Sequence, residues 1–133
     1  MRPNDRKYTK THEWVKISGE DALVGITDFA VQELCSGNEG DLVYCDLPEP
    51  GRNLEIGETF GEIESVKAVA DLNTPVAGTV TEVNQDLATT PEKINADAHG
   101  AWMVKVKLSN PGELKNLLSA ADYEKFVAEE AGH

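Results

Sequence analysis

Residues 61–75, GEIESVKAVADLNTP, constrain the fold of this chain more than any other stretch. Two short extended runs, residues 60–65 and 68–72, flank a tight centre at Lys67, and Pro75 closes the second run. Such a pair of runs predicts a β-hairpin with Lys67 at or near its tip. The hairpin would hold this lysine out in solvent on a defined support. Position alone also fits an ordinary surface lysine, because lysines are mostly exposed.

The rest of the chain also predicts short strands separated by Gly and Pro. A weak repeat of one pattern on the two sides of Lys67 supports a fold with two similar halves. Further strands are expected over residues 14–17, 22–26, 42–47, 76–83 with a break at Gly78, and 102–108, where apolar and other residues alternate. Helical segments are expected over residues 28–35 capped by Thr27, from Pro111 across Leu114, Leu117 and Leu118, and from Ser119 through Phe126. A short turn over residues 91–95 is expected after the helix-start signal at Thr90 and Pro91. This order predicts a mostly β protein, a small sandwich or flattened barrel with peripheral helices, and Trp14 and Trp102 are expected in its core.

Length and charge narrow the function. The 133 residues suggest one domain, residues 1–133, and a formal net charge of −12 argues against nucleic acid and against an anionic membrane surface. The charge favours a protein that is steered towards basic patches on partner proteins. No long apolar run or signal-peptide core is present, so we expect a bacterial cytoplasmic protein, or a mitochondrial matrix protein if this is a mature eukaryotic form. Cys35 and Cys45 are expected to be free thiols.

The chain carries no motif of a stand-alone catalyst. A Gly-rich phosphate loop, a nucleophile elbow and an H-E-x-x-H motif are all missing from the sequence, and no His lies at zinc-ligand spacing from the cysteines. The three histidines, His12, His99 and His133, have no recognisable catalytic partner in sequence. We therefore expect neither an enzyme nor a metal protein.

The motif around Lys67 resembles the lipoyl-attachment motif of the glycine cleavage system H-protein family. GEIESVKA is followed by Asp71 and by PVAGTV, and the resemblance continues in order through nearly the whole chain in THEWVK, VGITDFA, DLPEPG, TEVN and AWMVKVKLSNPGEL. It implies a lipoyl/biotinyl-type hammerhead fold extended at both ends. It also implies lipoic acid covalently attached to Lys67, with Glu64, Ser65, Val66 and Ala68 around it. Residues 36–40 depart from the family pattern as an apparent insertion.

The resemblance further implies a carrier with several partners. The glycine decarboxylase, a pyridoxal-phosphate enzyme, would load an aminomethyl group, and a tetrahydrofolate-dependent aminomethyltransferase would remove it. Dihydrolipoamide dehydrogenase would then reoxidise the dithiol. The carrier is expected to be a monomer. Because a lysine with a pKa of about 10.4 is neutral in only about one part in a thousand near pH 7, a lipoate ligase or lipoyl/octanoyl transferase must modify it.

Glu13 and Asp71 match family residues associated with the resting pocket of the lipoyl arm. A carboxylate beside the aminomethyl amine would stabilise its protonated form, which has no free lone pair to expel the sulfur. His12 could line the same cleft, although an ordinary half-buried histidine is the alternative. Two solvated acids on a very acidic protein are the alternative for Glu13 and Asp71.

Other carriers and other functions remain as alternatives. A biotinyl domain usually has Met on both sides of the lysine, where this chain has Val66 and Ala68, and a 2-oxoacid dehydrogenase lipoyl domain usually has Asp before it. An H-like protein that serves lipoate transfer, or an unmodified acidic binding module, would fit the same composition. Modification of Lys67 distinguishes a carrier from a binding module.

Overall fold

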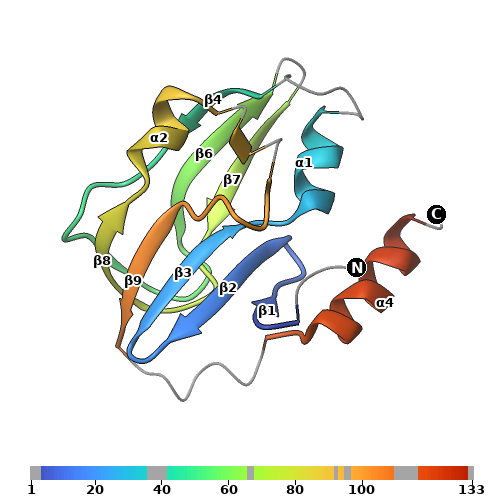
Figure 1. Cartoon of the computed structure of the whole chain (residues 1–133), viewed down its shortest axis with the longest axis horizontal. Helices are drawn as coiled ribbons and strands as arrows, with labels where there is room; N and C mark the ends of the chain where they lie inside the picture. The colour runs from blue at the N-terminus through green and yellow to red at the C-terminus, as the bar shows by residue number, and fades with distance from the viewer. Residues whose placement is uncertain are drawn as a thin grey trace.

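Two antiparallel β-sheets form the body of the protein (Figure 1). The computed structural model describes residues 4–35, 42–65, 68–91, 93–94, 97–109 and 117–131. The larger sheet has the order β1 (Lys7–Tyr8), β2 (Glu13–Ser18), β3 (Asp21–Ile26), β9 (Val104–Leu108), β8 (Gly78–Val83), β5 (Asn53–Leu54). The smaller sheet has the order β4 (Leu42–Asp46), β6 (Thr59–Ser65), β7 (Val69–Asn73). The helices with assigned bounds are α1 (Asp28–Cys35), α2 (Gln85–Thr89) and α4 (Ala120–Ala131).

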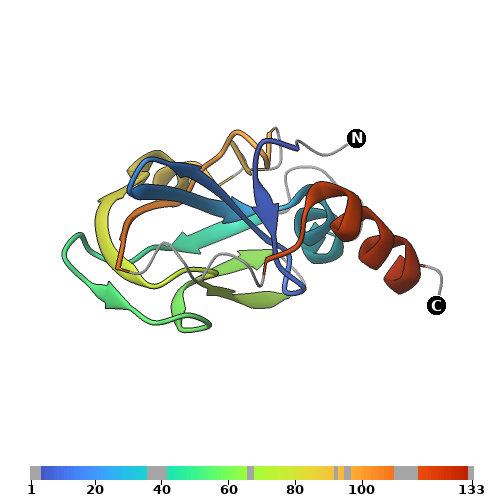
Figure 2. The ribbon, with the colours of Figure 1, turned by 90° about the horizontal axis from the view of Figure 1, so that it is seen from below.

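The main hydrophobic core lies between the two sheets. Val24, Val80 and Val106 from the larger sheet and Ile63 and Leu72 from the smaller sheet are all buried in one cluster. Figure 2 shows the sheets as two layers, with α4 at one end of the molecule. The mostly β fold with two packed sheets and peripheral helices is therefore confirmed.

A second, largely aromatic cluster fastens α4 to the sheets. It contains Tyr8 of β1, Trp14 of β2, Phe29 of α1, and Tyr123 and Val127 of α4. The rings of Tyr8 and Tyr123 stack with centroids 4.8 Å apart, an arrangement that aromatic pairs favour. Trp102 is half-buried against this same cluster. This cluster connects the C-terminal helix to the strand that carries Glu13.

Local capping signals mark the helix starts as predicted. The Ala30 N–H donates a 3.2 Å hydrogen bond to Thr27 Oγ1, which caps α1. The Asp122 N–H donates a 3.1 Å hydrogen bond to Ser119 Oγ, which caps α4. Both caps confirm the predicted helix starts, and α4 continues beyond the expected end at Phe126.

Two expectations were wrong in part, and one helix was not predicted. Leu118 is not helical, because its N–H and C=O exchange 2.8 Å hydrogen bonds with Tyr8 at the edge of β1. Residues 110–116 of that expected helix lie outside the described residues. The alternation of β9 begins at Val104, and Met103 before it is fully buried. Helix α2 was not predicted, and its only buried residue is Leu87, so it presents little periodic signal.

Gly61 lets β4 approach β6 closely, and we expect alanine there to destabilise the fold. A Cβ at Gly61 would lie 2.1 Å from the backbone oxygen of Asp46 on the neighbouring strand. Gly61→Ala should lower the free energy of unfolding by about 2 kcal/mol, a typical cost of overpacking. Urea denaturation measures this, with the exposed neighbour Glu62→Ala as control, for which we expect a change within about 0.5 kcal/mol. Equal midpoints for Gly61→Ala and wild type would contradict the close approach.

Candidate functional site

The predicted hairpin is formed by β6 and β7, which pair in antiparallel register. The Ser65 N–H donates a 2.8 Å hydrogen bond to Ala68 O, and the Ala68 N–H donates a 3.1 Å bond to Ser65 Oγ. Val66 and Lys67, between these two residues in sequence, lie outside the described residues. The two arms of the hairpin are thus confirmed, and the role of Lys67 stays a prediction.

The Ser65 hydroxyl also ties the hairpin to α1. It donates a 2.6 Å hydrogen bond to the backbone oxygen of Leu34 in the last turn of the helix. Ser65 is buried, so water competes little for this bond. The side chain of Glu64 lies on the opposite face of the sheet from that of Ser65. Glu64 is half-buried, and its neighbours across the sheet, Tyr44 and Val69, are exposed.

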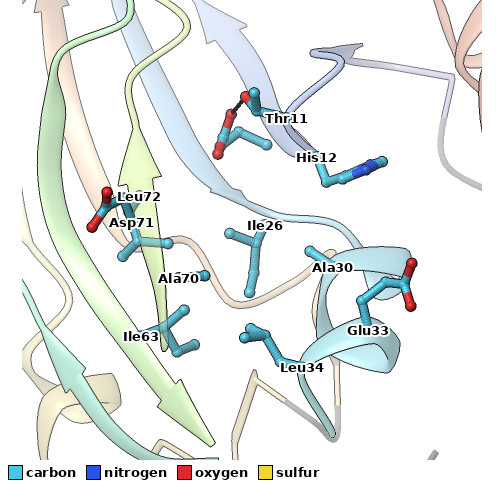
Figure 3. Close-up of a pocket in the computed structure, with 11 residues that line it drawn as sticks. Thr11, His12, Ile26, Ala30, Glu33, Leu34, Ile63, Ala70, Asp71 and Leu72 are labelled. Atoms are coloured by element: carbon cyan, nitrogen blue, oxygen red, sulfur yellow. Dashed lines mark hydrogen bonds between the residues drawn. The ribbon is translucent and has the colours of Figure 1, made fainter. Parts of the chain in front are cut away.

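A cavity of about 190 Å³ extends from the hairpin between α1 and β7 (Figure 3). Apolar side chains form most of its wall, and Thr11 lies at the end away from Ile63 and Leu34. The hydroxyl of Thr11 donates a hydrogen bond to the carboxylate of Glu13. The lining residues are Thr11, His12, Glu13, Ile26, Ala30, Glu33, Leu34, Ile63, Ala70, Asp71 and Leu72. The three predicted pocket residues therefore all contribute to one cavity.

Glu13 is the buried carboxylate of this site. The residue is 2% exposed, and its Oε1 accepts hydrogen bonds from the hydroxyls of Thr11 and Thr9, the latter at 2.8 Å. Burial, which disfavours the charged form, raises the pKa of Glu13 to about 7, while the threonine hydroxyls and a backbone hydrogen bond from Asn73 oppose that rise. Near neutral pH this carboxyl group can therefore be present in either form.

A second cavity adjoins the first at Thr11 and Glu13. Its volume is about 340 Å³. Its other walls are formed by the turn before β6, by the end of β7 and the residues that follow it, and by Leu117. The lining residues are Thr9, Thr11, Glu13, Ile56, Gly57, Asn73, Thr74, Pro75 and Leu117. Sequence reasoning missed Thr9 and Thr11, although both precede the buried acid within four residues.

Asp71 lines the cavity, but its carboxylate does not point into it. Asp71 is exposed and pairs with Glu62, which in turn pairs with Asp46, and all three are exposed. Because side chains alternate along a strand, Ala70 and Leu72 face inward while Asp71 faces the outer side of the smaller sheet. Figure 3 shows the Asp71 carboxylate turned away from the cavity.

His12 contributes to the cavity wall while its ring is bound to α4. Its Nδ1 lies 2.7 Å from the hydroxyl of Tyr123, and its Nε2 lies 3.1 Å from Oε2 of Glu130. Both ring nitrogens therefore have partners outside the cavity. His12 also has a φ of 72°, which is uncommon for a residue with a Cβ.

Other chemistry is sparse in the described part of the chain. Cys45 is a buried free thiol, and burial raises its pKa to about 12, so it is a poor nucleophile near neutral pH. Among the residues that the structure describes, no three His, Cys, Asp or Glu side chains are grouped so that they could hold a metal ion. The helices in the same described segments are too short or too polar to cross a membrane.

Comparisons with known proteins agree on one family. The family model described as glycine cleavage H-protein matches residues 6–130. The glycine cleavage system H protein of Koribacter versatilis is 60% identical over 131 residues, covering 98% of each chain. That of Acidobacterium capsulatum is 51% identical over 131 residues, again covering 98% of each chain.

A solved structure shares the fold. The crystal structure of a glycine cleavage system H protein from Mycobacterium marinum superposes with a TM-score of 0.81 at 36% sequence identity. The match covers 98% of this chain and 99% of the other.

Proposed function

Because this chain belongs to the glycine cleavage H-protein family, we propose that Lys67 is the residue to which lipoic acid is attached. Members of this family are the lipoyl-bearing shuttle proteins of the glycine cleavage system, and they are carriers and not catalysts. The observation that carries the assignment of Lys67 is the paired hairpin, which Ser65 and Ala68 close on either side of this residue and whose arms line the cavity through Ile63 and Ala70. We also propose that residues 1–133 act as one carrier domain in the bacterial cytoplasm, since the relatives named above are bacterial.

The cavity fits a lipoyl arm. Ile26, Ile63 and Leu72 supply apolar contacts for an aliphatic chain. Thr11, whose hydroxyl binds the carboxylate of Glu13, lies at the far end. When bound, the lipoyl group supplies a dithiolane that accepts electrons and carries the aminomethyl unit. A mostly apolar cleft with a few polar groups at one end is the usual design for such a ligand.

Glu13 is the group we assign to the ammonium end of the cargo. A positive charge next to this carboxylate favours the ionised form of Glu13 and the protonated form of the amine together. The hydroxyls of Thr9 and Thr11 hold the carboxylate oxygen in place. Asp71 is assigned to the cavity wall, with its carboxylate on the outer face of the sheet.

The proposed partners are the three enzymes that exchange cargo and electrons with this carrier. They are a pyridoxal-phosphate glycine decarboxylase, a tetrahydrofolate-dependent aminomethyltransferase and dihydrolipoamide dehydrogenase. A lipoate ligase or lipoyl/octanoyl transferase is the fourth, because the lysine is protonated near pH 7 and needs an activated acyl donor. The net charge of −12 favours association with basic patches on these enzymes.

Mass spectrometry tests the assignment of Lys67. The protein is co-expressed with a lipoate ligase in medium containing lipoate, and its intact mass is measured before peptide mapping. We expect a mass increase equal to one lipoyl group, located on the peptide that contains Lys67. An unmodified protein under conditions that modify a known lipoyl domain, or a lipoyl group on another lysine, would refute the proposal.

Glu13→Gln should shorten the lifetime of the loaded protein. Loss of the carboxylate removes a charge-assisted hydrogen bond to the ammonium group, so the rate of amine release should rise about tenfold. The release of amine from loaded protein is timed for Glu13→Gln and for Asp71→Asn. The second variant removes a carboxylate from the outer face, and we expect it to change the rate by no more than about twofold. Equal effects of the two substitutions would remove the special role of Glu13.

A further inference from the structure

The turn that presents Glu13 to the cavity has an unfavourable backbone conformation. His12 has a φ of 72°, in the left-handed region that residues with a Cβ rarely adopt. Its N–H donates a 3.1 Å hydrogen bond to Thr9 O, and the Thr9 N–H donates a 3.0 Å bond to Glu13 O. These bonds close a tight turn with Thr11 and Glu13 on its cavity side. Such a conformation persists when surrounding contacts hold it in place.

The His12 ring supplies many of those contacts. It packs against Phe29 of α1 with ring centroids 4.7 Å apart and against Phe126 of α4 at 5.9 Å. Its two nitrogens contact Tyr123 and Glu130, both on α4. The ring therefore joins the cavity turn to the C-terminal helix.

The hydroxyl oxygen of Tyr123 lies at the centre of the contacts between His12, α1 and α4. Tyr123 is fully buried, and its oxygen lies 2.7 Å from His12 Nδ1 and 2.7 Å from Thr27 Oγ1. Thr27 caps α1, and its N–H donates a 2.9 Å hydrogen bond to His12 O. Helix α1 forms the opposite wall of the cavity through Ala30 and Leu34. One hydroxyl thus contacts groups that hold both walls.

The hydroxyl of Tyr123 can join both of its neighbours at once. Thr27 Oγ1 accepts from the Ala30 N–H and keeps a second lone pair and its own proton for Tyr123. The Tyr123 hydroxyl has one proton, so it can donate to one of His12 Nδ1 and Thr27 Oγ1 and accept from the other. In either order it connects the His12 ring to Thr27, while His12 Nε2 faces the Glu130 carboxylate.

We propose that Tyr123 is a positioning residue for the Glu13 carboxylate, which it holds in the cavity wall by fixing the His12 ring and its left-handed turn. This inference rests on the proposed function for what the cavity receives. The placement of Glu13 is a property of the unmodified chain. It can be measured without any lipoyl group, so its failure is distinct from a failure of the Lys67 assignment.

The test follows Glu13 and His12 by NMR in unmodified protein. The carboxyl ¹³C shift of Glu13 is titrated in wild type and in Tyr123→Phe, and the ¹⁵N shifts of His12 report its tautomer. Without the hydroxyl the turn should move and expose the Glu13 carboxyl group to water. Because burial is what raises its pKa, the pKa of Glu13 should then fall by about one unit or more towards its ordinary value. Tyr8→Phe, which removes a buried phenol from the same aromatic cluster, should leave the Glu13 titration unchanged.

A double-mutant comparison shows whether the hydroxyl acts through the His12 ring. Glycine adopts positive φ without strain, so His12→Gly keeps the turn while removing the ring. In that background Tyr123→Phe should have no further effect on Glu13. An unchanged Glu13 titration in folded Tyr123→Phe would overturn the proposal. The same holds if Tyr8→Phe shifts the pKa of Glu13 as much as Tyr123→Phe does, or if Tyr123→Phe shifts it equally with and without the His12 ring. If Tyr123→Phe does not fold, the wild-type spectrum decides, because a ¹⁵N shift that shows His12 Nδ1 without a hydrogen bond would mean that Tyr123 does not hold the ring.

Discussion

A Lys67→Arg variant should acquire no lipoyl group and should support no glycine decarboxylation in a reconstituted system. Acylation needs the neutral amine of lysine, whereas a guanidinium group stays protonated with a pKa above about 12 and has no comparable nucleophilic nitrogen. The positive charge is kept, so the fold and the charge balance should not change. Intact mass and decarboxylation measured on the same preparation therefore separate loss of the attachment site from loss of structure.

Lys93→Arg is the matched control for this experiment. Lys93 is an exposed lysine near α2, where it pairs with Asp86 at 3.6 Å, and it lies outside the cavity. This variant should be lipoylated and active like wild type. A lipoyl increment on Lys67→Arg, or activity in its absence, would mean that another residue carries the cofactor.

The stability of the protein should fall between pH 5 and pH 8 because of Glu13. The folded-state pKa of about 7 lies above the usual 4.5, so the native state keeps this proton over a range in which the unfolded chain releases it. Above pH 4.5 the unfolded state therefore binds fewer protons, and the free energy of unfolding decreases as the pH rises to about 7. A difference of this size corresponds to about 3 kcal/mol, complete above pH 7.

Glu13→Gln isolates this contribution. Glutamine has nearly the same shape and does not titrate, so the variant should lack about 3 kcal/mol of the wild-type decrease between pH 5 and pH 8. Urea denaturation at both pH values measures the change for each protein. Glu33→Gln, at an exposed acid on the rim of the same cavity, should follow wild type. Parallel curves for wild type and Glu13→Gln would show that Glu13 titrates normally in the folded state.

Patterns that act over a few residues were predicted correctly. The two arms of the hairpin around Lys67, the alternation from Val104 to Leu108 and the Thr27 and Ser119 caps all depend on neighbours in sequence. The outward position of Asp71 was not predicted, although the inward-facing Ala70 and Leu72 that flank it on β7 give a local signal of the same kind. The sequence by itself determined these features, since strand alternation and capping depend on local backbone geometry.

Features that depend on distant contacts were decided by the tertiary structure alone. Leu118 pairs with Tyr8 across more than one hundred residues, and this pairing replaced the expected helix there. Glu13 was predicted as a pocket residue, but its raised pKa comes from its burial in the folded protein. His12 is fixed by Tyr123, which is 111 positions away. Burial and long-range hydrogen bonds exist only once the chain has folded, so the local sequence around Glu13 and His12 carries no signal of them.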